Sequence, residues 1–212
     1  MRFVQKWSYA CAKGLTAALN ENHNRKAVYY YGFYIILGSL VKTSILLTVS
    51  ALLGVLVPAL IIVVVFGSLR LFAGGYHFDT YGRCLFTSMA LTILAALISQ
   101  YTHQSWNIVQ LSMFFIIVFL ISLYVVIKYA PKDTPTKPIT DPVAIKKYKK
   151  LSVIYLVIFF IVCTILIVFN LKMYVISICF GIMLEIFSVT PIGHSFFTLI
   201  KKGLDNTKVK KM

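Results

Sequence analysis

The sequence predicts an all-α integral membrane protein with about six transmembrane helices and an amphipathic N-terminal helix at the membrane interface. Of its 212 residues, 59% are apolar and 13% are charged, whereas an average soluble domain is about 45–50% apolar and about 25% charged. The apolar residues form long runs, and most basic residues flank those runs. This composition excludes a disordered chain, a fibrous protein and a typical soluble enzyme.

Residues 1–26 precede the first apolar run and have the period of an amphipathic helix. They lack the short apolar core and the small-residue cleavage site of a signal peptide. We expect this helix to lie on the inner leaflet, with Trp7 among the lipid headgroups. The alternative is a helix packed on the protein's own cytoplasmic face. The predicted apolar face comprises Phe3, Val4, Trp7, Cys11, Leu15 and Ala18, and the polar face comprises Arg2, Lys6, Lys13 and Asn20.

Residues 27–190 form the predicted membrane domain. A helix needs about 20 residues to cross a hydrocarbon core of about 30 Å. The run 27–69 contains one charge, Lys42, and the run 84–127 contains none, so each run is long enough for two spans. We expect Lys42 to reach outward from the outer end of the first span and Pro58 to kink the second. The six predicted spans are residues 28–46, 51–69, 84–100, 109–127, 151–171 and 173–190.

The basic residues predict the orientation of these spans. The chain has 21 Lys and Arg against 6 Asp and Glu, a formal net charge of +15. Every Lys and Arg except Lys42 and Lys172 lies in the N-terminal segment, the connections 70–83 and 128–150, or the basic tail 191–212. By the positive-inside rule these segments are cytoplasmic, which places both termini on the inner side of a cell membrane. Because the charge follows the membrane boundary, we expect contact with anionic lipids and no nucleic-acid partner.

The connection 128–150 has two parts. Residues 131–142 contain four of the six prolines, so we expect an extended, partly polyproline arm. A cluster of four lysines follows, and two interpretations of it stay open. The cluster binds an acidic segment of a substrate, or it anchors the fifth span to anionic lipid. Its members are Lys146, Lys147, Lys149 and Lys150.

The residues most indicative of chemistry lie in the connection 70–84, between the second and third spans. Cys84 begins a helix, where the positive end of the helix dipole favours a thiolate. His77 is seven residues earlier, about 10.5 Å away along a continuous helix, which is too far for proton transfer. Gly74 and Gly75 allow the connection to fold back and bring His77 to Cys84. A Cys–His pair is the arrangement for acyl transfer by a thiolate nucleophile.

The structural alternative is a small apolar cysteine at the start of a membrane helix and a histidine bonded to backbone. The remaining cysteines, Cys11, Cys163 and Cys179, lie on an apolar face or within spans, where a thiol packs as an unreactive group. The chain has no paired cysteine motif and no zinc-protease motif. We therefore expect neither a metal nor a cofactor.

Several other side chains each admit more than one interpretation. Arg70 clamps a substrate carboxylate or anchors the end of the second span. Asp79 orients His77 or caps the following helix. Ser88 donates to an oxyanion or bonds its own helix backbone. Glu185 is the only carboxylate within a predicted span, which marks a function, an ion pair or a position at the interface.

Two segments of the sequence are similar to segments of one known family. The first runs from Arg70 through Gly74-Gly75-Tyr76-His77 to Cys84 and Ser88. The second is Tyr129-Ala-Pro-Lys-Asp-Thr-Pro-Thr-Lys-Pro-Ile139. Together they resemble the accessory gene regulator B (AgrB) family of quorum-sensing membrane peptidases. Length, span count and a basic connection agree as well, so the resemblance covers nearly the whole chain.

This resemblance implies a cysteine endopeptidase that acts on a propeptide of the AgrD type in a Gram-positive bacterium. It gives Cys84 the role of nucleophile and His77 that of general base and then acid, with Gly75 among the supporting residues. Cleavage removes an acidic C-terminal tail through an acyl-enzyme thioester. A Cys or Ser within the substrate then attacks the thioester and releases a thiolactone or lactone ring. The resemblance also implies a homodimer.

The alternative from another functional class is a non-enzymatic membrane protein, either a small transporter or a scaffold for peptide export. A transporter has polar residues at mid-depth in several spans, or paired broken helices. Only Pro58 and Glu185 point in that direction. A scaffold has no need of a Cys–His pair at the start of a helix.

Overall fold

The computed structural model describes residues 2–21, 23–76, 81–132 and 141–209, and side chains are described over 3–21, 25–76, 82–132 and 141–201. These residues form helices and connections, and their one element of β type is an isolated bridge. The helices, in chain order, are α1 (Arg2–Ala18), α2 (His23–Leu52), α3 (Leu56–Ala73), α4 (Tyr81–Thr102), the short η1 (His103–Ser105), α5 (Ile108–Tyr129), α6 (Pro142–Val168), α7 (Lys172–Val189) and α8 (Pro191–Val209).

Six helices, α2 to α7, are long and apolar enough to cross a membrane. This confirms the predicted all-α membrane fold and the predicted number of spans. The two charge-free runs divide as expected, because residues 53–55 separate α2 from α3 and residues 103–107 separate α4 from α5. The helices α2 and α6 begin several residues before the predicted spans 28–46 and 151–171.

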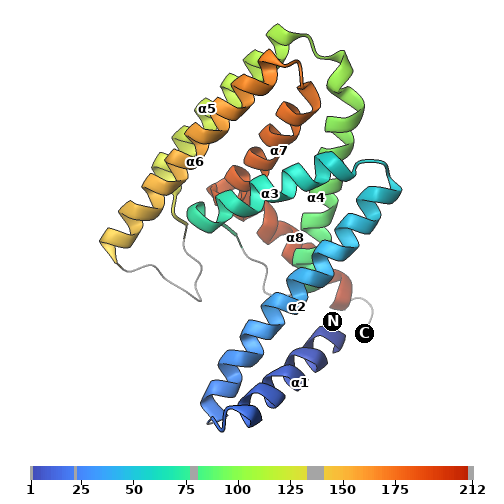
Figure 1. The fold of residues 1–212 in the computed structure, drawn as a ribbon, viewed down its shortest axis with the longest axis vertical. Helices are drawn as coiled ribbons and strands as arrows, with labels where there is room; N and C mark the ends of the chain where they lie inside the picture. The colour runs from blue at the N-terminus through green and yellow to red at the C-terminus, as the bar shows by residue number, and fades with distance from the viewer. Residues whose placement is uncertain (1, 22, 77–80, 133–140, 210–212) are drawn as a thin grey trace.

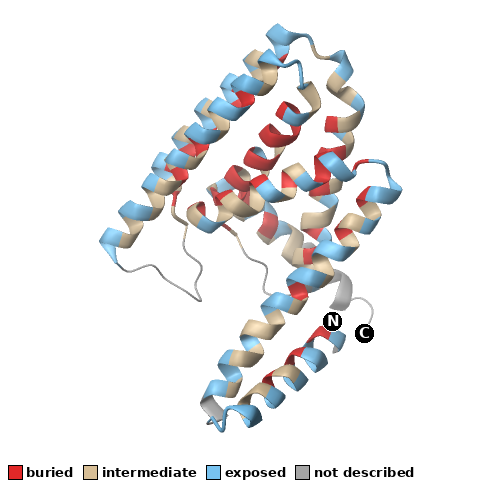
Figure 2. Ribbon diagram, viewed as in Figure 1, coloured by how far each residue is buried: buried red, intermediate tan, exposed pale blue. Residues whose placement is uncertain are grey.

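The helix α7 lies at the centre of the bundle (Figure 1). It contacts α3, α4, α5, α6 and α8. The helices α5 and α6 run side by side along one edge, whereas α1 and the first part of α2 form an arm that extends away from the bundle. Figure 2 shows the buried residues gathered on α7 and on the parts of its neighbours that face it.

Close packing of α3 against α7 depends on a glycine where the two helices cross. A Cβ atom at Gly181 would lie 2.9 Å from the Cβ atom of Val65 and 3.0 Å from the carbonyl oxygen of Ile62. Small residues of this kind let membrane helices approach one another, since lipid supplies no hydrophobic force to drive their association. This crossing holds the end of α3 against α7, and the connection to α4 leaves from that end.

The expectation that Pro58 kinks the second span is wrong. The helix α3 begins at Leu56, so Pro58 lies in the first turn, where a missing backbone N–H removes no intrahelical bond. The following residue, Ala59, still donates its N–H to the carbonyl of Val55 at 3.0 Å. Sequence alone did not locate this helix start, because Val55 offers no side-chain cap.

The N-terminal amphipathic helix forms as predicted, but the face that it packs against α2 overlaps the predicted apolar face only in part. Val4, Ser8 and Ala12 are buried, whereas Phe3 and Trp7 are exposed. Small side chains at a spacing of four residues allow α1 to approach α2 closely. This arrangement favours the second interpretation, a helix packed on the protein's own surface, and leaves the aromatic side chains free to meet lipid.

The expected boundaries of the basic connection and of the tail both need correction. Asp141 caps α6 by accepting the N–H of Val143 at 2.9 Å, and Pro142 occupies the first helical position. The four lysines therefore lie on the first turns of α6 rather than in a loop. Residues 133–140 of the proline-rich arm lie outside the described residues. The tail contains a further helix, α8, which the sequence interpretation missed.

Candidate active site

A cavity of about 180 Å³ lies where α2, α3, α4, α7 and α8 meet. Cys84 lines it from the first turn of α4, and Tyr76 lines it from the connection that follows α3. The residues that flank the segment 77–83 therefore line the same cavity. The other lining residues are Lys42, Phe66, Arg70, Thr87, Ser88, Leu91, Thr92, Leu184, Ser188 and Phe197.

Cys84 is half-buried and is the cysteine that lines this cavity. Cys163 and Cys179 are buried in the core, and Cys11 lies on α1. The hydroxyl of Ser88 donates to the carbonyl of Cys84 at 2.6 Å and so bonds its own helix, which is one of the two interpretations of that residue. The position of Cys84 near a helix start matches the sequence prediction.

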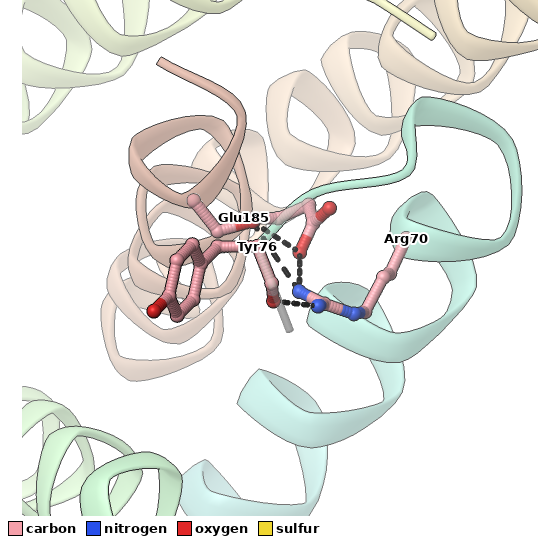
Figure 3. A network of polar contacts seen from close by, with 4 residues as sticks. Arg70, Tyr76 and Glu185 are labelled. Carbon is pink, nitrogen blue, oxygen red and sulfur yellow. Dashed lines mark hydrogen bonds and ion pairs between the residues drawn. The ribbon is translucent and has the colours of Figure 1, made fainter. Parts of the chain in front are cut away.

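Arg70 joins α7 to the segment that follows α3 (Figure 3). Its Nη1 atom lies 3.2 Å from Oε2 of Glu185 and 3.3 Å from Oγ of Ser188. Its Nη2 atom donates to the carbonyl oxygen of Tyr76. The guanidinium thus bonds to a carboxylate on one side and to the backbone of the connection on the other. Glu185 is fully buried, which excludes the interface position, and it forms the ion pair that was another of its three sequence interpretations.

Gly74 and Gly75 hold the connection in conformations that L residues rarely adopt. Their φ angles are +76° and +133°. A Cβ atom at Gly75 would overlap Oγ of Ser188 and lie 3.2 Å from Oε1 of Glu185, and one at Gly74 would overlap the carbonyl of Lys132. Glycine is therefore required both by the backbone angle and by the space available.

Lys132 joins the two segments whose sequences resemble the AgrB family. Its N–H donates to the carbonyl of Ala73 at 2.8 Å, and its carbonyl accepts the N–H of Gly75 at 3.4 Å. These bonds accompany the bridge between Gly74 and Lys132. The segment that follows α5 therefore supports the connection that leaves α3.

The side chain of Tyr76 packs on α8. Its ring stacks on Phe197 with centroids 5.2 Å apart and meets the edge of His194 at 5.1 Å. The Tyr76 N–H donates to the carbonyl of Ser188 at 3.2 Å. Burial, with a smaller contribution from Lys132, lowers the pKa of His194. The helix that sequence analysis missed thus forms one wall of the cavity.

Comparison with known proteins identifies the family. The family described as accessory gene regulator B matches residues 8–189 of the chain. The chain belongs to the AgrB family. This places the protein in the accessory gene regulator system of quorum sensing, as a multi-pass membrane component.

Two relatives illustrate this membership. An AgrB-like protein of Clostridium perfringens strain 13 is 26% identical over 90% of this chain and 93% of its own length. The accessory gene regulator protein B of Staphylococcus aureus strain MW2 is 30% identical over 77% of this chain and 82% of its own length. No solved structure matches the chain.

The structure of this AgrB-family protein describes only part of the predicted site. Cys84, Arg70, Gly75 and Ser88 all lie at the cavity or against its wall. His77 and Asp79 lie outside the described residues, so their pairing with Cys84 stays a prediction. Lys146, Lys147 and Lys150 are exposed on α6, away from the cavity lining, and Lys149 donates to the carbonyl of Ile127 at 2.8 Å.

The position of Lys42 differs from the expected one. It does not reach outward from the end of the first span but lines the cavity that contains Cys84, well before α2 ends at Leu52. The error arose because hydropathy placed the end of this span at residue 46. A lone charge within a membrane helix marks a function or a pair, and that signal was available in the sequence.

Proposed function

We propose that this protein is a membrane cysteine endopeptidase that cleaves a propeptide of the AgrD type and promotes its cyclisation. The main support for this proposal is a cavity that is lined by both Cys84 and Tyr76, the residue directly before His77. Among the described cysteines, Cys84 is the one that lines this cavity. A nucleophile needs a space in which the scissile carbonyl can approach it, and this cavity supplies that space.

The proposed reaction has two acyl transfers. His77 takes the proton of the Cys84 thiol, the sulfur attacks the scissile carbonyl, and the C–N bond breaks as His77 returns the proton to the leaving amine. The N-terminal part of the propeptide then remains on Cys84 as a thioester. A thiol or hydroxyl within that fragment attacks the thioester, loses its proton to the Cys84 sulfur and releases the ring.

Ring closure competes with hydrolysis of the thioester, so water must be limited. The cavity walls include the apolar side chains of Phe66, Leu91 and Leu184. Apolar walls disfavour water near the thioester. Attack from within the same fragment is also favoured by its high effective concentration. These two effects together support cyclisation rather than simple hydrolysis.

We also propose that the cavity faces the cytoplasm, as the distribution of basic residues predicts. Single cysteines at Lys146 and at Gln104 test this orientation in a variant that lacks the other cysteines. A membrane-impermeant thiol reagent applied to intact cells is expected to label residue 104 and to spare residue 146. The opposite labelling would place the cavity on the outer face and contradict the proposal.

Co-expression with a cognate propeptide tests the activity. Cys84→Ala and Cys84→Ser are expected to abolish release of the C-terminal tail, measured by mass spectrometry. Cys163→Ala is the matched control, since Cys163 is also a membrane-helix cysteine but packs in the core. Release of the tail by Cys84 variants present in the membrane at normal levels would refute the assignment.

A further inference from the structure

Glu185 is an unusual group for a helix that crosses a membrane. It is fully buried within α7, and its Oε1 atom has no hydrogen-bond partner among the described residues. Burying an ionised carboxylate is costly, and the attraction within a buried ion pair often fails to offset that cost. A contribution to stability is therefore a weak explanation for this pair. Arg70 also bonds to groups other than Glu185, and these bonds suggest another role for the pair.

The guanidinium of Arg70 bonds to two parts of the protein at once. Nη1 bonds to Oε2 of Glu185 and to Oγ of Ser188, and Nη2 bonds to the carbonyl of Tyr76. Figure 3 shows Arg70 between Glu185 on one side and the Tyr76 carbonyl on the other. Because a guanidinium is planar and rigid, fixing one edge fixes the direction in which the other edge donates.

Ser188, which lies on α7 like Glu185, is also part of this arrangement. Its hydroxyl lies 3.3 Å from Oε2 of Glu185, and its carbonyl accepts the Tyr76 N–H at 3.2 Å. Both backbone groups of Tyr76 are thus bonded, one to Ser188 and one to Arg70. Glu185 bonds to Arg70 and Ser188, and these two residues bond the backbone of Tyr76, so Glu185 acts on the connection through them.

Gly75 brings the connection directly onto this polar group. A Cβ atom at Gly75 would lie 3.2 Å from Oε1 of Glu185 and 3.3 Å from Nη1 of Arg70. The two residues before His77 are therefore placed by contacts with α7. No contact of Glu185 with Cys84 is needed for this effect.

We propose that Glu185 is a positioning residue for the catalytic histidine. It holds Arg70, and Arg70 together with Ser188 holds the backbone of Tyr76, the residue directly before His77. This inference rests on the proposed function, because it assigns a role within the Cys84–His77 pair. The competing account is an ion pair that only joins α3 to α7.

Steady-state kinetics in proteoliposomes separates the two accounts. Glu185→Gln keeps the shape of the side chain and removes its charge. Proton transfer is sensitive to displacements of about 1 Å, so we expect kcat for a purified propeptide to fall about 10- to 100-fold with KM nearly unchanged. The pH dependence of kcat, which reports the Cys84–His77 pair in the bound complex, is expected to shift.

Ser188→Ala is a second variant in case Glu185→Gln inserts poorly. It removes one bond to Arg70 and is expected to lower kcat about 3- to 10-fold, in the same direction. Ser177→Ala is the matched control, because Ser177 is a buried serine of α7 whose hydroxyl donates to the carbonyl of Met173 within its own helix. It is expected to keep the wild-type kcat, KM and pH profile.

A measurement without substrate distinguishes failure of this inference from failure of the proposed function. Limited trypsin digestion in detergent is expected to cleave after Arg83 at least 5-fold faster in Glu185→Gln, with cleavage after Lys172 unchanged. Wild-type kcat in both variants, or an unchanged rate of cleavage after Arg83, would overturn the positioning role. Processing by Cys84→Ala would instead refute the peptidase proposal, and the digestion would still decide how Glu185 acts.

Discussion

The helices α7 and α2 cross the same membrane but are built for different surroundings. In its most apolar window α7 is 61% buried inside the protein, whereas α2 is 17% buried. The helix α2 exposes large apolar side chains, among them Val28, Tyr31 and Leu40. These side chains suit lipid, and they need no protein partner.

The comparison teaches that apolarity does not identify the central helix of a membrane bundle. The helix α6 is the most apolar of the six and is as little buried as α2. The central α7 instead contains three buried polar residues, Ser177, Glu185 and Ser188. The helix α4 also contains three, Thr87, Thr92 and Ser99. Polar groups that lipid cannot satisfy must find partners inside the protein, so they mark the helices that line the site, and α7 is the one of these that also contains a buried carboxylate.

The largest expected effect comes from filling the contact between α3 and α7. Gly181→Ala places a methyl group 2.9 Å from Cβ of Val65 and 3.0 Å from the Ile62 carbonyl, which is backbone and cannot rotate away. We expect a loss of about 1–3 kcal/mol in stability. Thermal unfolding in detergent, followed by a thiol-reactive or intrinsic fluorescence signal, measures it.

The control for that substitution is Gly32→Ala on α2. A Cβ atom at Gly32 has nothing within 4 Å, and alanine is a better helix former than glycine by about 1 kcal/mol. This variant is expected to be neutral or slightly stabilised. Equal destabilisation by the two alanines would show that α7 is not packed more tightly than α2 and would contradict the comparison.

An intermediate effect is expected from the exposed start of α6. Replacing Lys146, Lys147 and Lys150 with glutamine is expected to lower processing about 3-fold at limiting propeptide and to weaken its dependence on salt, because exposed charges accelerate encounter. Excess propeptide is expected to restore the rate. Lys149→Gln is the contrast, since Lys149 is bonded to Ile127. Unchanged processing by the triple variant at low salt would leave these lysines only as membrane anchors.

The smallest effect is expected on the exposed face of α1. Trp7→Ala removes a side chain that is 56% exposed, so the unfolding temperature in detergent is expected to change by no more than about 1 °C. Ala12→Leu is the contrast, because Ala12 is fully buried against α2. A larger loss from Trp7→Ala than from Ala12→Leu would mean that the apolar face predicted from the sequence, and not the face buried here, makes the contact.

The sequence predicted the spans well because charge-free runs directly report what can lie in lipid. It did not predict the neighbours of those spans, since hydropathy does not distinguish lipid from protein as an apolar surrounding. Lys42 and Pro58 were misplaced for a different reason, because each position depends on where a helix begins or ends and hydropathy does not locate these ends. The helix α8 was missed because its basic residues suggested a solvated tail, although Thr190 and Pro191 form a helix start.

The sequence identified candidate residues of the site but not the contacts that hold them in place. Cys84 was identifiable from its place at a helix start, and Glu185 from being the only carboxylate within a span. The bond between Arg70 and Glu185 joins residues that are 115 positions apart in the chain. No local pattern reports such a pairing, although a buried acid and a basic residue at the same end of two spans are natural partners.

The central claim is that Cys84 carries the acyl group of the substrate. The most direct measurement uses a propeptide whose ring-forming Cys or Ser is replaced by alanine, so that the thioester cannot be resolved by cyclisation. After incubation and acid quenching, mass spectrometry is expected to find the N-terminal fragment attached to the peptide that contains Cys84, and neutral hydroxylamine is expected to release it. Release of the tail with no such adduct, or with the adduct on Cys11, Cys163 or Cys179, would contradict the claim.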